Sequence, residues 1–140
     1  MKTKLILALI LFSFCFAAAQ DKKKKSEFTE LKKHPSISQM AAPVYPETAK
    51  KLGITGMVVL ELSINEKGDV TKTSVATANF EFTKEMQLDD AARNKINTEF
   101  EKAAIDAAMK MKFNPGIDKN GSAVKCSVMQ PFKFKLGDKK

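Results

Sequence analysis

The sequence is poor in cysteine and histidine, the residues that form disulfides and most often bind transition metals. Its 140 residues include two cysteines and a single histidine. His34 has no cysteine or histidine nearby to complete a ligand set, so no metal site is expected. We recognise no nucleophile–base pair, metal cluster or phosphate-binding loop. The chain is therefore expected not to be an enzyme and to carry no cofactor.

Long hydrophobic runs are also scarce. The one extended apolar run, residues 5–19, is short for a transmembrane helix, which needs about 20 apolar residues. Lys2 and Lys4 precede this run, and the small residues Ala17-Ala18-Ala19 close it. This layout predicts a secretory signal peptide over residues 1–19 that is cleaved on export. The alternative is an uncleaved anchor in the inner membrane, because the basic run Lys22 to Lys25 is unusual directly after a cleavage site.

Basic residues outnumber acidic residues in the part of the chain that follows the predicted signal peptide. Cleavage would leave 22 basic and 16 acidic residues, a net charge of +6, and would leave Cys126 as the only cysteine. A single cysteine forms no internal disulfide, and the parity of Cys126 in its segment predicts a buried structural thiol. Nucleic acid is not an expected partner, because the basic residues are not interleaved with aromatics. Lys22 to Lys25 can instead contact an anionic envelope surface, or can simply keep a solvated leader soluble.

Residues 20–42 are interpreted as a basic flexible leader, residues 43–137 as one domain and residues 138–140 as a tail. At the start of the domain, Tyr45-Pro46 opens a short helix that ends at Gly53, a residue free to adopt positive φ. Alternation over Met57 to Ile64 predicts a half-buried strand. A hairpin loop follows, with Gly68 in the left-handed conformation.

The second half of the domain predicts one further strand, a long helix and a last strand. Val70 to Ala78 is β-prone, with a bulge expected between Val70 and Val75. Phe80 to Met86 is expected to be an inserted loop or a helix extension. The long helix has an apolar stripe at helical spacing, is capped by Asp89 or Asp90, and ends by Asn114-Pro115. Its stripe consists of Ile96, Phe100, Ala103, Ala107 and Met111.

The last strand is expected over Val124 to Leu136 and alternates apolar and polar residues. Pro131 cannot donate a ladder hydrogen bond, so this strand should lie at a sheet edge. The element order is helix, strand, strand, helix, strand. It predicts a two-layer α+β domain, in which a small antiparallel sheet of about three strands packs against one short and one long helix.

An ordered set of short motifs resembles the C-terminal domain of the TonB family. The motifs are Tyr45-Pro46 with Ala49, Gly56-x-Val58, Gly68-x-Val70, and Met111-x-Phe113 followed by Pro115. Met111 stands where a tryptophan is usual in the family, and methionine is an adaptable core residue that can fill this place.

The resemblance implies a periplasmic binding module that acts in energy-dependent transmembrane transport. In this family an extended segment called the TonB box, at the N-terminus of an outer-membrane TonB-dependent transporter, docks by strand addition. The segment before the first helix would help to hold the peptide. Carried over by position, the receiving strand contains Val124, Lys125, Cys126, Ser127, Val128, Met129, Gln130, Phe132 and Phe134, and the flanking segment contains Val44, Tyr45 and Pro46.

Other interpretations of the same features remain open. Pro131, Lys125, Lys133 and Lys135 are residues that protect a sheet edge, so the edge can also bind nothing. A TonB that transduces energy has an anchor and a long Pro-rich spacer, and cleavage of residues 1–19 would leave neither here. The alternative function is a structural envelope protein that contacts peptidoglycan or an inner-membrane energising complex. A strand-exchanged homodimer is compatible with both functions.

Overall fold

The computed structural model describes residues 30–82 and 86–137. The predicted signal peptide, the basic run Lys22 to Lys25 and the tail 138–140 lie outside these residues. Neither described helix has the length and apolar character needed to cross a membrane.

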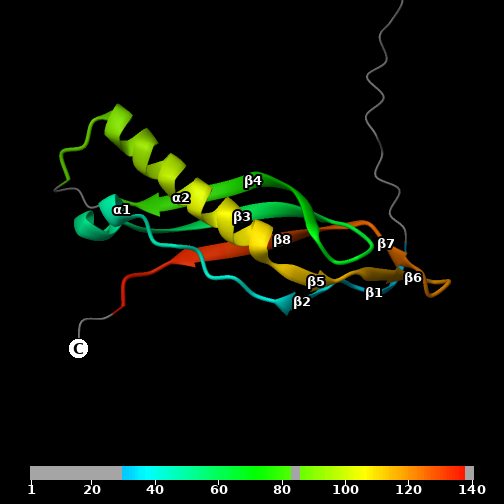
Figure 1. Cartoon of the computed structure of the whole chain (residues 1–140). Coiled ribbons are helices and arrows are strands. Elements are labelled where there is room, and N and C mark those ends of the chain that lie inside the picture. Colours follow the sequence, from blue (N-terminus) through cyan, green and yellow to red (C-terminus); the bar gives the residue numbers. More distant parts are fainter. Residues whose placement is uncertain (1–29, 83–85, 138–140) are drawn as a thin grey trace, which may run out of the picture.

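A three-stranded antiparallel sheet with the order β4-β3-β8 forms one layer, and a long helix packs across one face of it (Figure 1). The strands are β3 (Thr55–Ile64), β4 (Val70–Glu81) and β8 (Cys126–Phe134), and the helices are α1 (Glu47–Leu52) and α2 (Asp90–Lys110). The predicted α+β two-layer class and the order of these five elements are confirmed.

Apolar and more exposed residues alternate in β3, and its apolar residues form the part of the core that comes from the sheet. Val58, Leu60, Leu62 and Ile64 are at most 1% exposed. Burying such side chains stabilises a fold by about 1.5–3 kcal/mol each. These four residues face α2, which contributes its own buried residues: Ile96, Phe100, Ala104, Ala107 and Ala108.

Phe100 of α2 lies at the centre of an aromatic cluster. The cluster joins the long helix to β4, to β8 and to the segment before α1. The Phe100 ring stacks on Phe80 of β4, with centroids 4.8 Å apart, and meets Phe134 of β8 edge-on at 4.8 Å. Tyr45, just before α1, contacts both Phe100 and Phe134 edge-on, at 5.7 and 5.8 Å. Aromatic pairs of this geometry add about 0.5–1.5 kcal/mol beyond area burial.

The turns and bulges follow the sequence closely. Gly53 ends α1 in the left-handed conformation at φ 71°, and Gly68 takes φ 87° in the β3–β4 loop. Between Val70 and Val75 the register with β3 skips one residue, which is the predicted bulge. A second irregularity in β4 falls opposite Val59 and Leu60.

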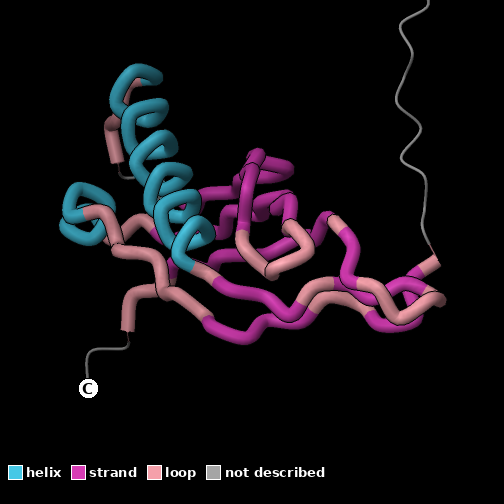
Figure 2. The backbone as a smooth tube through the Cα atoms, turned by 45° about the vertical axis from the view of Figure 1, so that its right-hand side comes forward, coloured by secondary structure: helices cyan, strands magenta, loops and turns pink. Residues whose placement is uncertain are grey.

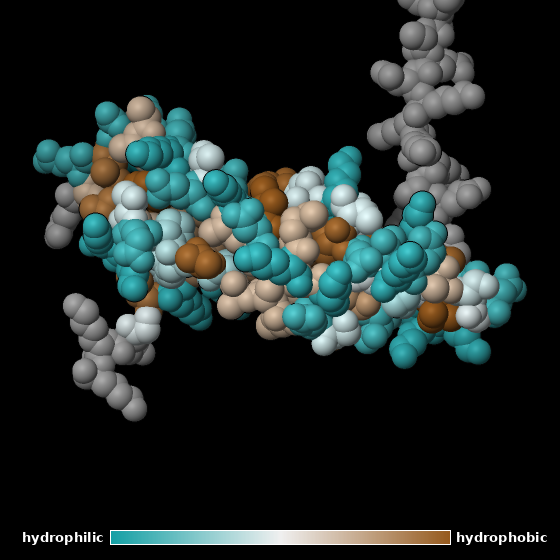
Figure 3. Space-filling view, viewed as in Figure 1, coloured by the Kyte–Doolittle hydropathy of each residue, from teal (hydrophilic) through white to brown (hydrophobic). Residues whose placement is uncertain are grey.

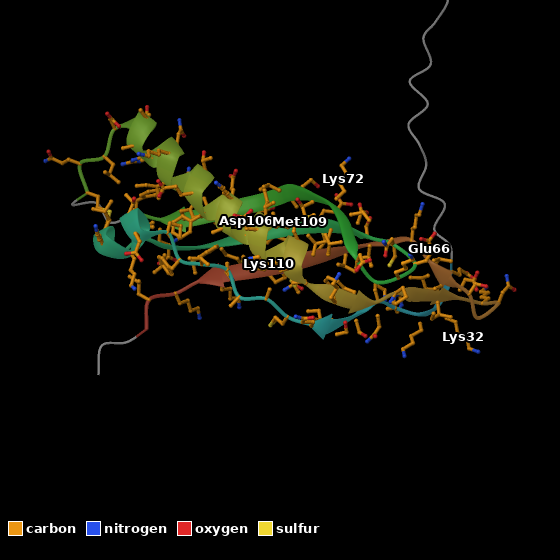
Figure 4. The ribbon with its side chains drawn as sticks, in the orientation of Figure 1. Lys32, Glu66, Lys72, Asp106, Met109 and Lys110 are labelled. Carbon is orange, nitrogen blue, oxygen red and sulfur yellow. The ribbon has the colours of Figure 1, made fainter. Side chains whose placement is uncertain are left out.

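The long helix begins and ends within the predicted limits. Asp89 is the N-cap, and its carboxylate accepts a hydrogen bond of 2.7 Å from the amide of Ala92. Phe80 and Glu81 belong to β4 and α2 begins only at Asp90, so the described residues of this region form no helix extension. Residues 83–85 lie outside the described part of the chain. The helix ends at Lys110, before Asn114-Pro115 as predicted, because Lys112 to Asn114 form a strand. Its outer surface is hydrophilic over most of its length and carries Asp106, Met109 and Lys110 in the second half (Figures 3 and 4).

Five short strands extend the molecule beyond the main sheet (Figure 2). They are β1 (Leu31–Lys33), β2 (Ser36–Gln39), β5 (Lys112–Asn114), β6 (Gly116–Asp118) and β7 (Ala123–Val124). β1 pairs with β6, β6 pairs with β7, and β2 pairs with β5.

The expectation of a flexible leader up to residue 42 is therefore wrong for its second half. β1 and β2 form backbone ladders with segments some 80 residues later in the chain. Their side chains are mostly exposed, so hydrogen bonds of the main chain rather than burial hold them in place. No helical or strand periodicity signals such pairing.

Candidate functional site: the open edge of the main sheet

β8 is an outer strand of the main sheet. It pairs with β3 over its full length, from Ile64↔Cys126 to Gly56↔Phe134. Among residues 30–82 and 86–137, no strand pairs with β8 on its other side. An outer strand with an unpaired side presents N–H and C=O groups that a further strand can join. The edge position inferred from Pro131 is confirmed.

The position of Pro131 also indicates which residues present these groups. Pro131 lies opposite Val59 in an unbroken register. A proline is tolerated there when its nitrogen faces away from the neighbouring strand. In an antiparallel ladder, alternate residues point their backbone groups to the same side. We infer that Ser127, Met129 and Lys133, which share the parity of Pro131, direct their N–H groups to the open side.

The open edge is interrupted at its middle. Pro131 has no N–H to offer, and its carbonyl accepts a hydrogen bond of 3.1 Å from the side-chain amide of Gln130. Gln130 is the residue that breaks the apolar alternation of β8. Its side chain occupies an acceptor that an added strand would otherwise use.

The side chains of β8 follow the predicted alternation. Phe132 and Phe134 are buried against the core, while Val128, Gln130 and Cys126 are half-buried on the same face. Cys126 is thus less enclosed than the buried thiol that was expected. The opposite face exposes Ser127, Met129, Pro131 and Lys133 to solvent.

Two residues predicted for the receiving strand lie outside it. Val124 belongs to β7, where it pairs with Gly116 of β6, and Lys125 lies between β7 and β8. The cause is the length of β3, which ends at Ile64 opposite Cys126 and offers no partner to earlier residues. The open strand is therefore Cys126–Phe134.

The flanking segment divides into residues with different surroundings. Tyr45 packs on Phe134 at the end of β8, and its hydroxyl donates a hydrogen bond of 2.5 Å to the carbonyl of Ile54. Burial raises the pKa of this phenol. Pro46 is the N-cap of α1. Val44 is 77% exposed and lines a groove against α2 rather than the edge of β8.

A second wall, which no sequence motif predicts, lies beside the edge. A hollow of about 710 Å³ separates Ser127, Val128 and Met129 from the segment around β1, including Leu31 and Pro35. An ion pair between Glu30 and Lys119 lies among its lining residues. No local pattern in the sequence indicates this wall, because its residues come together only through the pairing of β1 with β6.

Within the described residues, no group of three or more His, Cys, Asp or Glu side chains is placed to hold a metal ion. The arrangement offers main-chain hydrogen bonds and a partly apolar hollow. Such an arrangement is chemically suited to binding an extended chain.

Comparison with known proteins identifies the family of this domain. Residues 41–98 match the family model described as Gram-negative bacterial TonB protein C-terminal. The domain belongs to the TonB C-terminal family. The "Protein TonB" sequences of two strains of Xanthomonas campestris pv. campestris are 32% identical over 101 residues, which is 72% of this chain.

The fold of this chain is also similar to that of a solved TonB C-terminal domain. The solution NMR structure of the Pseudomonas aeruginosa TonB C-terminal domain aligns with a TM-score of 0.51 at 21% identity, and the alignment covers 76% of this chain and 90% of that one. The chain spans only 38% of the length of the Xanthomonas relatives. The similarity therefore concerns the TonB C-terminal domain rather than the whole of those proteins.

Proposed function

We propose that this domain binds extended peptides by strand addition along the open edge of β8. The peptides are TonB-box-type segments of outer-membrane TonB-dependent transporters, and binding acts in energy-dependent transport across the outer membrane. The chain would carry out this role in the periplasm. The observation that carries the proposal is the unpaired side of Cys126–Phe134, which is free of any described strand.

Membership of the TonB C-terminal family supports the choice of ligand. Strand addition suits this edge because main-chain hydrogen bonds give affinity to an extended chain whatever its side chains are. Ser127, Met129 and Lys133 would donate to peptide carbonyls. Lys133 and Lys135 are exposed near one end of the edge, so they also favour acidic residues in the peptide.

The test is an NMR titration of the ¹⁵N-labelled chain with synthetic peptides from the N-termini of TonB-dependent transporters of the same cell. The expected result is a set of saturable shifts in the amides of Ser127, Met129 and Lys133. The absence of shifts with every such peptide would contradict the proposal. Shifts that depend on protein concentration without peptide would instead indicate that a second copy of the chain occupies the edge.

A proline scan provides a matched control. Met129→Pro removes one N–H from the open side and leaves the ladder with β3 intact, as Pro131 already does. This variant should keep its thermal stability within a few degrees and lose peptide binding. Gln130→Pro removes an N–H from the β3 side and should destabilise the fold itself. Unchanged peptide binding in a folded Met129→Pro chain would show that the peptide binds elsewhere.

A further inference from the structure

The open edge of β8 is not equally suited to peptide along its length. In the half around Pro131 the open side lacks one N–H donor, because proline has none, and the side chain of Gln130 already occupies the carbonyl of Pro131. Its half around Ser127–Met129 has alternating donors and acceptors and borders the hollow. Recognition should therefore concentrate on the second half.

The hollow has a second wall that comes from the N-terminal side of the same chain. Leu31 and Pro35 line the hollow on this side, and Val128 and Met129, which point to opposite faces of β8, line it along the sheet edge. Leu31 is held in place because β1 pairs with β6 and because its methyl groups lie against Gly116, where even a Cβ atom would be only 3.2 Å away. The wall is thus a fixed part of the fold and not a loose leader.

The lining of the hollow indicates what it accepts. Leu31, Pro35, Val128 and Met129 make most of its surface apolar, while His34 and Ser127 add two polar side chains, and Met129 is 58% exposed. Glu30 and Lys119 pair with each other and so neutralise their charges. A strand beside Ser127–Met129 would have its backbone bound by β8 and one side chain enclosed between the two walls.

We propose that this hollow is a specificity pocket that selects one apolar side chain of the docked peptide. The segment from Glu30 to Pro35 forms the outer wall of the pocket. The inference rests on the proposed strand addition and assigns its selectivity to a part of the chain that precedes the predicted domain. The remainder of the peptide, beyond Pro131, contributes less to the affinity.

The first experiment changes the peptide. In the transporter peptide that binds most tightly in the titration above, each residue in turn is replaced by Asp, and the Kd is measured by the same amide shifts. One position should weaken about tenfold or more, which is the effect of about 1.4 kcal/mol of lost apolar burial. The side chain at that position should show nuclear Overhauser contacts to the methyl groups of Leu31. Equal tolerance at all positions, or no contact to Leu31, overturns the pocket.

The second experiment changes the protein. Met129→Ser and Val128→Thr remove apolar surface from the hollow, and should weaken binding of the unmodified peptide about fivefold to tenfold. Met40→Ser and Val75→Thr are matched controls, since both residues are exposed and lie outside the hollow. The controls should leave the Kd unchanged.

The outcomes separate the two proposals. Binding that shifts β8 but is indifferent to Met129→Ser and Val128→Thr overturns the pocket and leaves strand addition standing. Failure of every peptide to shift β8 overturns both.

Discussion

The amide of Phe113 donates a hydrogen bond of 2.9 Å to the carbonyl of Gly68. This bond joins the β3–β4 loop to β5, which follows the long helix. Next to it, Asp69 and Lys112 form an ion pair of 2.5 Å, and this ammonium group holds the pKa of the Asp69 carboxyl below its usual value. The loop is thereby fixed to the far end of the helix.

Gly68→Ala is expected to be severely destabilising. A Cβ at this position would lie 1.8 Å from the carbonyl oxygen of Phe113, and φ is 87°. The backbone of Phe113 cannot move away without breaking its own hydrogen bonds. We therefore predict that the free energy of unfolding falls by about 3 kcal/mol or more. Gly121→Ala is the control, because its φ is 85° and nothing lies within 4 Å of the added atom. The control should cost about 1 kcal/mol. Equal losses in urea denaturation of both variants would show that the conformation alone, and not the close approach to Phe113, matters.

Tyr45→Phe tests the hydrogen bond to Ile54 without removing the ring. The carbonyl of Ile54 would lose its side-chain donor, which costs about 1–2 kcal/mol. Tyr45→Ala also removes the contacts with Phe100 and Phe134 and should cost about 3 kcal/mol or more. Thermal or urea unfolding measures both. A Phe variant as stable as the original chain would mean that the hydroxyl contributes nothing.

The phenol of Tyr45 is also expected to lose its proton at a higher pH than an unburied tyrosine. Burial raises its pKa above the ordinary value of 10.0, so the folded state favours the neutral phenol. Its contribution to stability is complete below pH 10 and is lost as the pH rises through the raised folded value. Because the chain has one tyrosine and no tryptophan, the ultraviolet absorbance of the phenolate reports this group alone. The midpoint should fall towards 10 in urea. An identical midpoint in folded and unfolded chains would contradict the burial.

Asp89→Ala should weaken the start of α2. The lost cap bond to Ala92 costs about 1 kcal/mol. Asp90→Ala is a close control, since Asp90 lies within the first turn and makes only a favourable interaction with the helix dipole, worth a few tenths of a kcal/mol. Differential scanning calorimetry distinguishes the two. A larger loss of stability for Asp90→Ala than for Asp89→Ala would indicate that Asp90 is the N-cap and that the helix begins one residue later.

The central sheet and its edge could be predicted from the sequence because their signals are local. The alternation of Val58, Leu60, Leu62 and Ile64 determines one buried face, and a proline at position 131 is compatible only with an outer strand. Gly53 and Gly68 mark positions of positive φ. Each of these inferences needs only a few neighbouring residues.

The accessory strands could not be predicted in the same way. β1 and β2 are three and four residues long, are mostly exposed, and depend on partners near residues 112–118. Short strands of this kind have too few side chains to show a period. The hollow beside Met129 was missed for the same reason, since its outer wall exists only after β1 has paired with β6. The end of α2 could be predicted only to lie before Asn114-Pro115, because the apolar helical spacing continues to Met111 although β5 already begins at Lys112.

The pairing of β1 with β6 has a mechanical consequence. β1 lies at the end of the molecule where β6 and β7 form their hairpin, away from α1, and the exposed Lys32 lies there (Figures 1 and 4). Tension that entered the domain through its N-terminal side would first load a ladder of three residues, then β2, and only afterwards the packed core. The outer wall of the hollow would thus yield before the sheet that it borders.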